Sequence, residues 1–249
     1  MEGIVLRRID YGESDQVVKI FLKELGCVSG IAKGIKRSKK RFPHRLEPFR
    51  VFDFTLGRKK PGQGLYFIQA ADQLRDFEGI KEDIQKIALG NLILEMVLVS
   101  VKEEHAHPDL YAFILECFQA LCDAGEIAPL WFYAEIHIMR LLGFSPNFET
   151  CLTCKSPIQK SEDNIFDASG GGVVCPRCRP RHLDTTRPVT SGPLGVLQFL
   201  KRVPPGAVSR VRISDTAREE IASLLAAFIT YHLERPLKSL PFLSELMAG

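Results

Sequence analysis

Four cysteines in two C-x-x-C pairs constrain this chain more than any other feature of its sequence. One pair is Cys151 with Cys154, the other is Cys175 with Cys178, and twenty residues separate the two pairs. Each pair directs two sulfurs toward one point, and two pairs complete the tetrahedron of thiolates that Zn²⁺ prefers. The spacing therefore predicts one structural zinc ion held by these four cysteines.

Two reducible disulfides, or four unliganded thiols, are the alternative interpretation of the same residues. A catalytic zinc ion would keep one coordination position open and would usually recruit a histidine or a carboxylate. Neither an H-x-E nor an H-E-x-x-H motif accompanies the cysteines. A structural site is therefore favoured over a catalytic one.

The remaining cysteines and the N-terminus indicate the cell compartment. Cys27, Cys117 and Cys122 lie in apolar patterns that predict buried thiols. The first residues lack the basic start and long apolar run of a signal peptide. The most apolar segment, residues 84–101, is interrupted by charged and polar side chains. We therefore expect a cytoplasmic protein with reduced thiols and no membrane span.

Residues 1–75 have the pattern of a small β domain, with runs of valine, isoleucine and phenylalanine separated by glycine and proline. Alternation places Phe52, Phe54 and Leu56 on one face. Five short strands suit a small closed barrel; an OB-fold is the natural candidate, and another barrel or a sandwich is the alternative. The predicted strands are Gly3–Tyr11, Gln16–Leu22, Cys27–Lys33, Phe49–Gly57 and Leu65–Leu74.

The β region is strongly basic. Residues 1–60 hold 15 Lys and Arg against 7 Asp and Glu, whereas the rest of the chain has a net charge of −5. Loops of a barrel can line a groove that follows a phosphate backbone, so two basic clusters favour nucleic acid over a merely solvated surface. The predicted contacts are Lys33, Lys36, Arg37, Lys39, Lys40, Arg41 and Arg45 in one loop and Arg58, Lys59 and Lys60 in the next.

Beyond residue 79 the period becomes helical. Apolar residues at helical spacing predict one long helix between residues 84 and 101, a second that begins at Pro108, and a third that begins at Pro129 and ends at Gly143. After the cysteine segment, Pro193 begins a short helix. Ser214 or Thr216 caps the next helix, with Glu219 completing a capping box.

These patterns predict an α+β chain in two domains. An OB-fold β-barrel, the nucleic-acid-binding domain, occupies residues 1–78. An all-helical domain, residues 79–249, carries a four-cysteine zinc-binding lobe at 148–183. Arg177, Arg179 and Arg181 flank the second cysteine pair, and they are explained equally well by an exposed loop and by contact with DNA.

Several segments together resemble the RecO family of bacterial recombination mediators. They run in order along nearly the whole chain, so the resemblance is more specific than the cysteine pattern alone. The segments are G-I-V-L-R-R-I-D-Y-G-E-S-D, A-K-G-I-K-R-S-K-K followed by L-E-P-F, L-L-G-F-S-P-N-F-E-T-C-L-T-C, F-D-A-S-G-G-G-V-V-C-P-R-C and L-K-S-L-P-F-L.

The resemblance implies an N-terminal OB-fold, a helical domain and, where the cysteines are kept, a zinc site. It also implies a bacterial, nucleoid-associated DNA repair and recombination protein. Such a protein binds single- and double-stranded DNA, anneals complementary strands and helps to load the recombinase together with RecR. Proteins of this family also contact the tail of the single-stranded-DNA-binding protein. An acidic, apolar tail would suit Arg235 and Lys238 beside Leu237 and Phe242, although ordinary exposed side chains explain them as well.

Three other functions compete with a non-enzymatic mediator. The first is an RNA-binding protein with an OB-fold and a zinc ribbon. The second is a zinc-dependent hydrolase or nuclease. The sequence argues against it, because it has no paired carboxylate motif, phosphate-binding loop or nucleophile elbow. The third is a scaffold whose basic loops only increase solubility.

Overall fold

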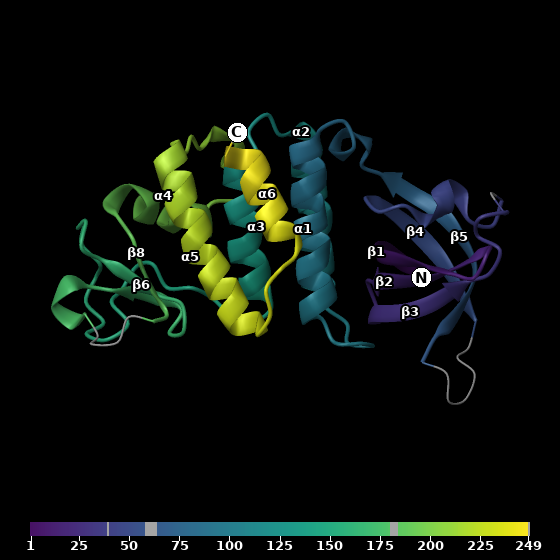
Figure 1. The fold of residues 1–249 in the computed structure, drawn as a ribbon, viewed down its shortest axis with the longest axis horizontal. Coiled ribbons are helices and arrows are strands. Elements are labelled where there is room, and N and C mark those ends of the chain that lie inside the picture. The colour runs from purple at the N-terminus through teal and green to yellow at the C-terminus, as the bar shows by residue number, and fades with distance from the viewer. Residues whose placement is uncertain (39, 58–63, 180–183, 249) are drawn as a thin grey trace. The chain divides into compact units, whose positions relative to one another are not determined.

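The computed structural model describes residues 1–38, 40–57, 64–179 and 184–248. The chain forms two compact units, the first made of Met1–Gly90 and Leu94–Cys122 and the second of Asn91–Ile93 and Asp123–Gly249 (Figure 1). The first unit extends past residue 78 because it includes helices that follow the barrel, and the division at 78/79 stays a prediction.

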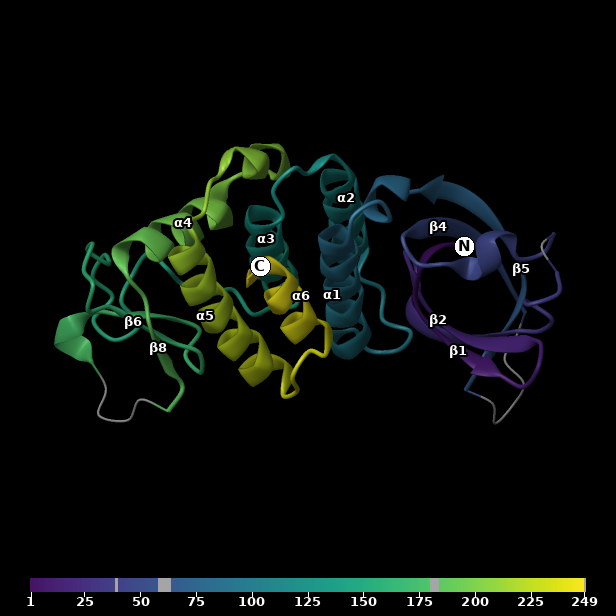
Figure 2. The same ribbon diagram turned by 45° about the horizontal axis from the view of Figure 1, so that its top comes forward.

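The N-terminal strands close into the predicted OB-fold barrel (Figures 1 and 2). Their order is β1-β2-β3-β5-β4, in which β3 and β5 run parallel and the other neighbours antiparallel. Closure removes the exposed edges of the sheet. The predicted strand segments were correct to within two residues at each end. The strands are β1 Glu2–Tyr11, β2 Asp15–Leu22, β3 Gly26–Ala32, β4 Arg50–Gly57 and β5 Tyr66–Asp76.

Alternation along the strands fills the barrel interior. On β4, Phe52 and Phe54 are buried and Leu56 packs partly buried against the same core, as the sequence predicts. The segment between β3 and β4 also enters this core, since Ile35, Phe42 and Leu46 are at most 1% exposed. That segment includes the short 3-10 turn η1 Pro43–Leu46, and a second turn, η2 Glu78–Ile80, follows β5.

Helix α2 Pro108–Asp123 and the connection that leads to it from α1 Ile84–Ser100 cover one half of the barrel's outer face. The ring of Phe21, which points outward from β2, lies 5.6 Å from that of Tyr111 on α2. The connection between the helices pairs with β3, because the Glu104 amide donates to the Cys27 carbonyl at 2.9 Å. Cys27 is fully buried there, as the sequence predicts, and burial raises the pKa of its thiol to about 12.

The second unit is built around a helix that is buried on every side. Every residue of this helix from Ala128 to Met139 is buried, and it packs against the two long helices that follow the cysteine segment. Gly143 ends it with a positive φ of 95°, as predicted. The helices are α3 Ala128–Leu141, α4 Ser191–Arg202, α5 Asp215–Leu233 and α6 Ser239–Ala248, with the 3-10 turn η4 Pro205–Arg210 after α4.

The predicted capping box at α5 is wrong. Ser214 is the N-cap, and its hydroxyl accepts a hydrogen bond from the Ala217 amide at 3.3 Å. Thr216 therefore lies inside the first turn, so Glu219 is not at the position from which it could complete a box. Within the described residues, no helix is both long and apolar enough to cross a membrane.

The cysteine lobe contains a small sheet that the sequence did not predict. Its strands are β6 Ile165–Asp167, β7 Gly172–Val174 and β8 Thr186–Pro188, in the order β7-β6-β8, with the 3-10 turn η3 Pro176–Cys178 after β7. Since β8 pairs with β6, the lobe extends past residue 183. Phe148, Phe166 and Phe228 of α5 form a chain of aromatic contacts that joins the lobe to the helices, with tilted rings in the first pair and an edge-to-face arrangement in the second.

Glu135 of α3 is a carboxyl buried among apolar side chains. It is 1% exposed, and neither oxygen has a hydrogen-bond partner of good geometry among the described residues. Burial raises the pKa of this carboxyl to about 8, against a weaker opposing effect of the Trp131 indole N–H. The folded protein therefore holds a proton that the unfolded chain releases near the ordinary pKa of 4.5.

Replacing Glu135 with glutamine should remove a pH dependence of stability. Because the pKa is higher in the folded state, stability falls as the pH rises from about 4.5 to about 8. We expect wild-type protein to lose at most about 1.4 kcal/mol per pH unit relative to Glu135→Gln over this window. Urea denaturation across the pH range measures the difference. Glu219→Gln, at an exposed position of α5, is the control. A stability difference that does not change with pH would contradict the assignment.

Candidate metal centre and nucleic-acid interface

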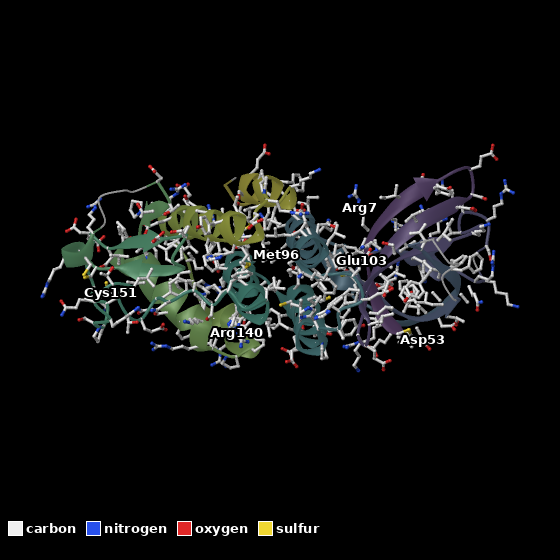
Figure 3. The ribbon with its side chains drawn as sticks, turned by 90° about the horizontal axis from the view of Figure 1, so that it is seen from below. Arg7, Asp53, Met96, Glu103, Arg140 and Cys151 are labelled. Atoms are coloured by element: carbon white, nitrogen blue, oxygen red, sulfur yellow. The ribbon has the colours of Figure 1, made fainter. Side chains whose placement is uncertain are left out.

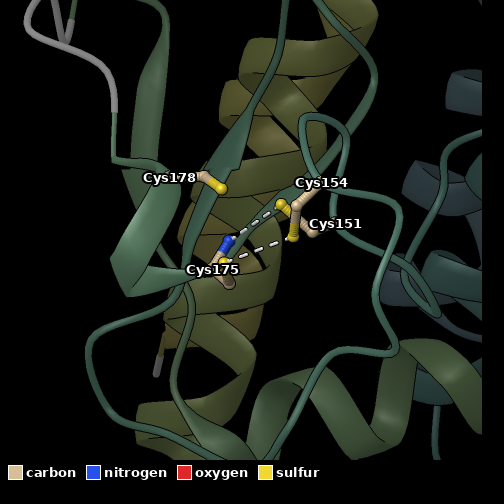
Figure 4. Close-up of side chains that lie close together, drawn as sticks. All are labelled: Cys151, Cys154, Cys175 and Cys178. Carbon is tan, nitrogen blue, oxygen red and sulfur yellow. Dashed lines mark hydrogen bonds between the residues drawn. The ribbon is translucent and has the colours of Figure 1, made fainter.

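The four predicted cysteines meet at one point in the lobe. Their sulfurs all lie within 4.8 Å of one another, and those of Cys154 and Cys175 are 3.9 Å apart (Figure 4). Cys151 is fully buried, whereas Cys154 is exposed and Cys175 and Cys178 are half-buried. This arrangement of four soft donors suits a tetrahedral metal ion.

Two tight turns present the cysteines. In the first, the Lys155 amide donates to the Cys151 carbonyl at 3.0 Å, and Lys155 adopts a positive φ of 61°. In the second, the Cys178 amide donates to the Cys175 carbonyl at 3.0 Å. Gly172 lets the first turn approach the sheet, since a Cβ there would lie 2.7 Å from the Leu152 side chain. The glycines before the second pair therefore have a packing role.

Electrostatics prepare the sulfurs to bind a cation. Burial opposes ionisation of Cys151, yet N–H groups of Cys175, Cys154 and Thr153 lower the pKa of its thiol to about 6. The neighbouring sulfurs of Cys154 and Cys175 raise the pKa of Cys178 to about 12. Four thiolates this close repel one another without a cation, so a bound divalent ion is what would let all four ionise together.

The second candidate site is the other half of the barrel's outer face, called the uncovered half because no described element packs over its exposed residues Ile9 and Tyr11. Strand register places Arg7, Ile9 and Tyr11 of β1 on this face, opposite Lys19, Val17 and Asp15 of β2 respectively. Ile9 is 51% and Tyr11 60% exposed. Figure 3 labels Arg7 on this strand and Glu103 on the connection that covers the other half.

Lys19 marks the border between the two halves. Its ammonium group donates to Glu103 at 2.5 Å and to the Ser29 hydroxyl at 3.1 Å. On the uncovered side, Tyr11 lies opposite Asp15, and Arg7 lies on the same face of β1 with Ile9 between them. Exposed aromatic rings and basic side chains on one surface are the residue types on which bases stack and phosphates are neutralised.

The predicted basic segment begins beside this surface. Its apolar side chains are anchored in the barrel core, and Asp15 accepts the Gly34 amide at 2.8 Å, which lowers the pKa of that carboxyl. Lys36 pairs with Asp10 at 2.9 Å, and Arg37 makes a longer, exposed contact with Glu13. Within the described part of the chain, Lys33, Lys40, Arg41 and Arg45 are exposed and make no ion pair.

Comparison with known proteins assigns the whole chain. The family model described as recombination protein O N terminal matches residues 1–77, and the model described as recombination protein O C terminal matches residues 81–241. The chain belongs to the RecO family. This confirms the resemblance found in its sequence.

Relatives named DNA repair protein RecO cover the chain almost end to end. Those of Anaeromyxobacter sp. strain K and strain Fw109-5 are 32% and 33% identical over 247 residues, 99% of this chain and 96% and 95% of theirs. The relative from Thermoanaerobacter sp. strain X514 is 27% identical over 247 residues, 98% of this chain and 96% of its own.

The structure describes only some of the remaining predicted site residues of this RecO chain. Lys39, Arg58, Lys59, Lys60 and Arg181 lie outside the described residues. Arg235 and Lys238 are exposed between α5 and α6, near buried Leu237 and half-exposed Phe242. Arg7, Ile9 and Tyr11 are not among the candidate site residues predicted from the sequence. The alternation of β1 indicates that they share a face, but it does not indicate that this face is exposed.

The cysteine geometry predicts one metal ion per chain with four sulfur ligands. Cobalt added to metal-free protein should give the intense sulfur-to-metal absorption and tetrahedral ligand-field bands of a tetrathiolate site, saturating at one equivalent. Cys151→Ser should weaken binding and loosen the lobe while the barrel keeps its structure, because metal binding and local folding are coupled. Cys122→Ser is the control. Saturation without tetrahedral thiolate bands would contradict the site.

Proposed function

We propose that this protein is a non-catalytic DNA repair and recombination mediator. It binds single- and double-stranded DNA, anneals complementary strands, and assists recombinase loading with RecR on strands coated by single-stranded-DNA-binding protein. It would act in the bacterial cytoplasm, associated with the nucleoid. Membership of the RecO family supports a role in repair.

The uncovered half of the barrel is the observation that carries the proposal for DNA. It combines exposed Ile9 and Tyr11 with Arg7 and adjoins a basic segment that is anchored in the core. Such a surface neutralises phosphates without reading sequence, which annealing requires because the bases must stay free to pair. Neutralising both strands also lowers their mutual repulsion.

We propose that the metal is zinc and that its role is structural. Four thiolates complete a tetrahedral shell, so the site offers no vacant position for a substrate, in contrast to catalytic zinc sites with three protein ligands. The ion would hold the two cysteine turns together next to β6 and β7. This favours a mediator over a zinc-dependent hydrolase.

The partner-tail site remains at Arg235 and Lys238. Their charges and the half-exposed Phe242 suit a peptide that is acidic and apolar. A second surface of the same unit has similar chemistry: a cavity of about 420 Å³ is lined by Val196, half-exposed Phe199 and Arg210. Variants of the two surfaces can therefore be compared directly.

Removing positive charge from the basic segment should weaken DNA binding, because the protein neutralises one phosphate fewer for each lysine that is replaced. Lys33→Ala/Lys40→Ala is expected to lower single-strand affinity for all sequences and to reduce the salt slope by about 1.4, or roughly 0.7 per contact. The control is Lys23→Ala/Lys102→Ala, which removes the same charge from exposed positions outside the basic segment. A filter-binding salt series with single-stranded DNA, double-stranded DNA and RNA measures both quantities. Equal slopes for the two variants would exclude this segment, and clear preference for RNA would favour the RNA-binding alternative.

Annealing should proceed without ATP. We expect wild-type protein to accelerate pairing of complementary oligonucleotides coated with single-stranded-DNA-binding protein, and Arg235→Ala/Lys238→Ala to slow only the coated reaction. Phe199→Ala/Arg210→Ala tests the second surface in the same assay. No acceleration over spontaneous pairing, coated or uncoated, would reject annealing. Full activity of Arg235→Ala/Lys238→Ala would reject only the tail site.

A further inference from the structure

A cavity of about 520 Å³ lies beside the cysteine cluster, and the mediator function does not account for it. Cys154 and Cys175 form part of its wall. None of the described residues that line it carries a carboxylate. The lining includes Pro157, Lys160, Ser161, Asn164, Pro176 and Arg177.

Asn164 supplies an acceptor that has no donor. The side chain is 1% exposed, and its Nδ2 donates to the carbonyls of Gln159 at 3.0 Å and Ser161 at 3.1 Å. These two bonds fix the orientation of the amide, since only nitrogen can donate to both carbonyls. Its Oδ1 accepts no hydrogen bond from any described group. A buried acceptor of this kind is normally satisfied, and Asn164 lines the cavity, so a ligand there that brings an N–H or O–H group could supply the missing donor.

Two cations and two prolines in the cavity wall indicate which other chemical groups the ligand carries. Lys160 and Arg177 are exposed and make no ion pair with any described residue, so they favour an anion. The guanidinium of Arg177 can donate two hydrogen bonds to the oxygens of a phosphate or stack on a base. Pro157 and Pro176 add apolar walls.

We propose that this cavity binds one nucleotide of a single DNA strand. Its phosphate contacts Lys160 and Arg177, and its base donates an N–H group to Asn164 Oδ1. Every DNA base carries such a donor, an exocyclic amine in adenine, cytosine and guanine and the ring imide in thymine, so the contact tolerates any sequence. This inference rests on the proposed DNA-binding function and adds the cysteine lobe to the surface that the strand contacts.

The test uses full-length, zinc-loaded protein and two arginines of the same loop. Arg177 lines the cavity, whereas Arg179, also exposed, does not. Arg177→Ala should lower the affinity for a single-stranded oligonucleotide about three- to tenfold and reduce the salt slope by roughly 0.7, and Arg179→Ala should change neither as much. Zinc content is measured for each variant. Lys160→Ala replaces Arg177→Ala if the latter loses metal.

A second measurement addresses the base contact. In ¹⁵N-labelled protein, thymidine monophosphate should shift the Asn164 side-chain amide signals, whereas deoxyribose 5-phosphate should shift only the signals of the cationic residues. Equal DNA binding by the Arg177 and Arg179 variants, with wild type binding normally, would overturn the cavity proposal and leave the barrel proposal intact. If both Lys160→Ala and Arg177→Ala lose zinc, the role of these two cations is instead to balance the negative charge of the four cysteine thiolates. Shifts caused by an acidic peptide but not by the nucleotide would assign the cavity to a protein partner.

Discussion

The packing of α2 and of the α1–α2 connection against one half of the barrel determines what the other half can do. Phe21 and Cys27 point outward from the barrel and would expose apolar surface without this cover. The approach is close at Gly26, where a Cβ would lie 1.9 Å from the His105 carbonyl oxygen. Because the cover stops at Lys19, the strand residues beyond it stay open to solvent.

The basic segment between β3 and β4 is likewise positioned by apolar side chains that are buried in the barrel. A loop rich in lysine and arginine repels itself and would be expected to be mobile. Here Phe42 and Leu46 are buried in the barrel core, and Asp15 holds the Gly34 amide. Apolar anchors thus fix the backbone while the charged ends project, which lowers the entropy lost when a strand binds.

The cysteine lobe has two independent sources of order. Its base is held by the aromatic contacts among Phe148, Phe166 and Phe228, which do not involve the cysteines. Among the described residues, its outer part has a small apolar cluster around Cys151, Ile165 and Val174, so we expect the turns there to depend on the metal. Loss of the ion should therefore loosen the outer lobe, including the cavity next to it, more than the helices.

Most of the fold could be predicted from periodicity, and the failures have physical causes. Strands of seven or more residues and helices of twelve or more show their period, whereas strands of three residues, as in β6, are too short to alternate. Ser214 and Thr216 are both residue types that cap helices, and the period of the helix does not distinguish two starts only two residues apart; in the structure the Ser214 hydroxyl is the cap. The cysteine site follows from spacing alone. The uncovered face of β1 does not, because alternation identifies outward residues but not which of them another element covers.

The central claim is that single-stranded DNA lies on the uncovered half of the barrel. Hydroxyl-radical footprinting of side chains, read by mass spectrometry with and without saturating DNA, tests it directly. Tyr11, Ile9 and the β5 residue Leu74 are all at least half exposed, so each should react in free protein. We predict that DNA protects Tyr11 and Ile9 and leaves Leu74 unchanged. Full reactivity of Tyr11 in the DNA complex would contradict the account.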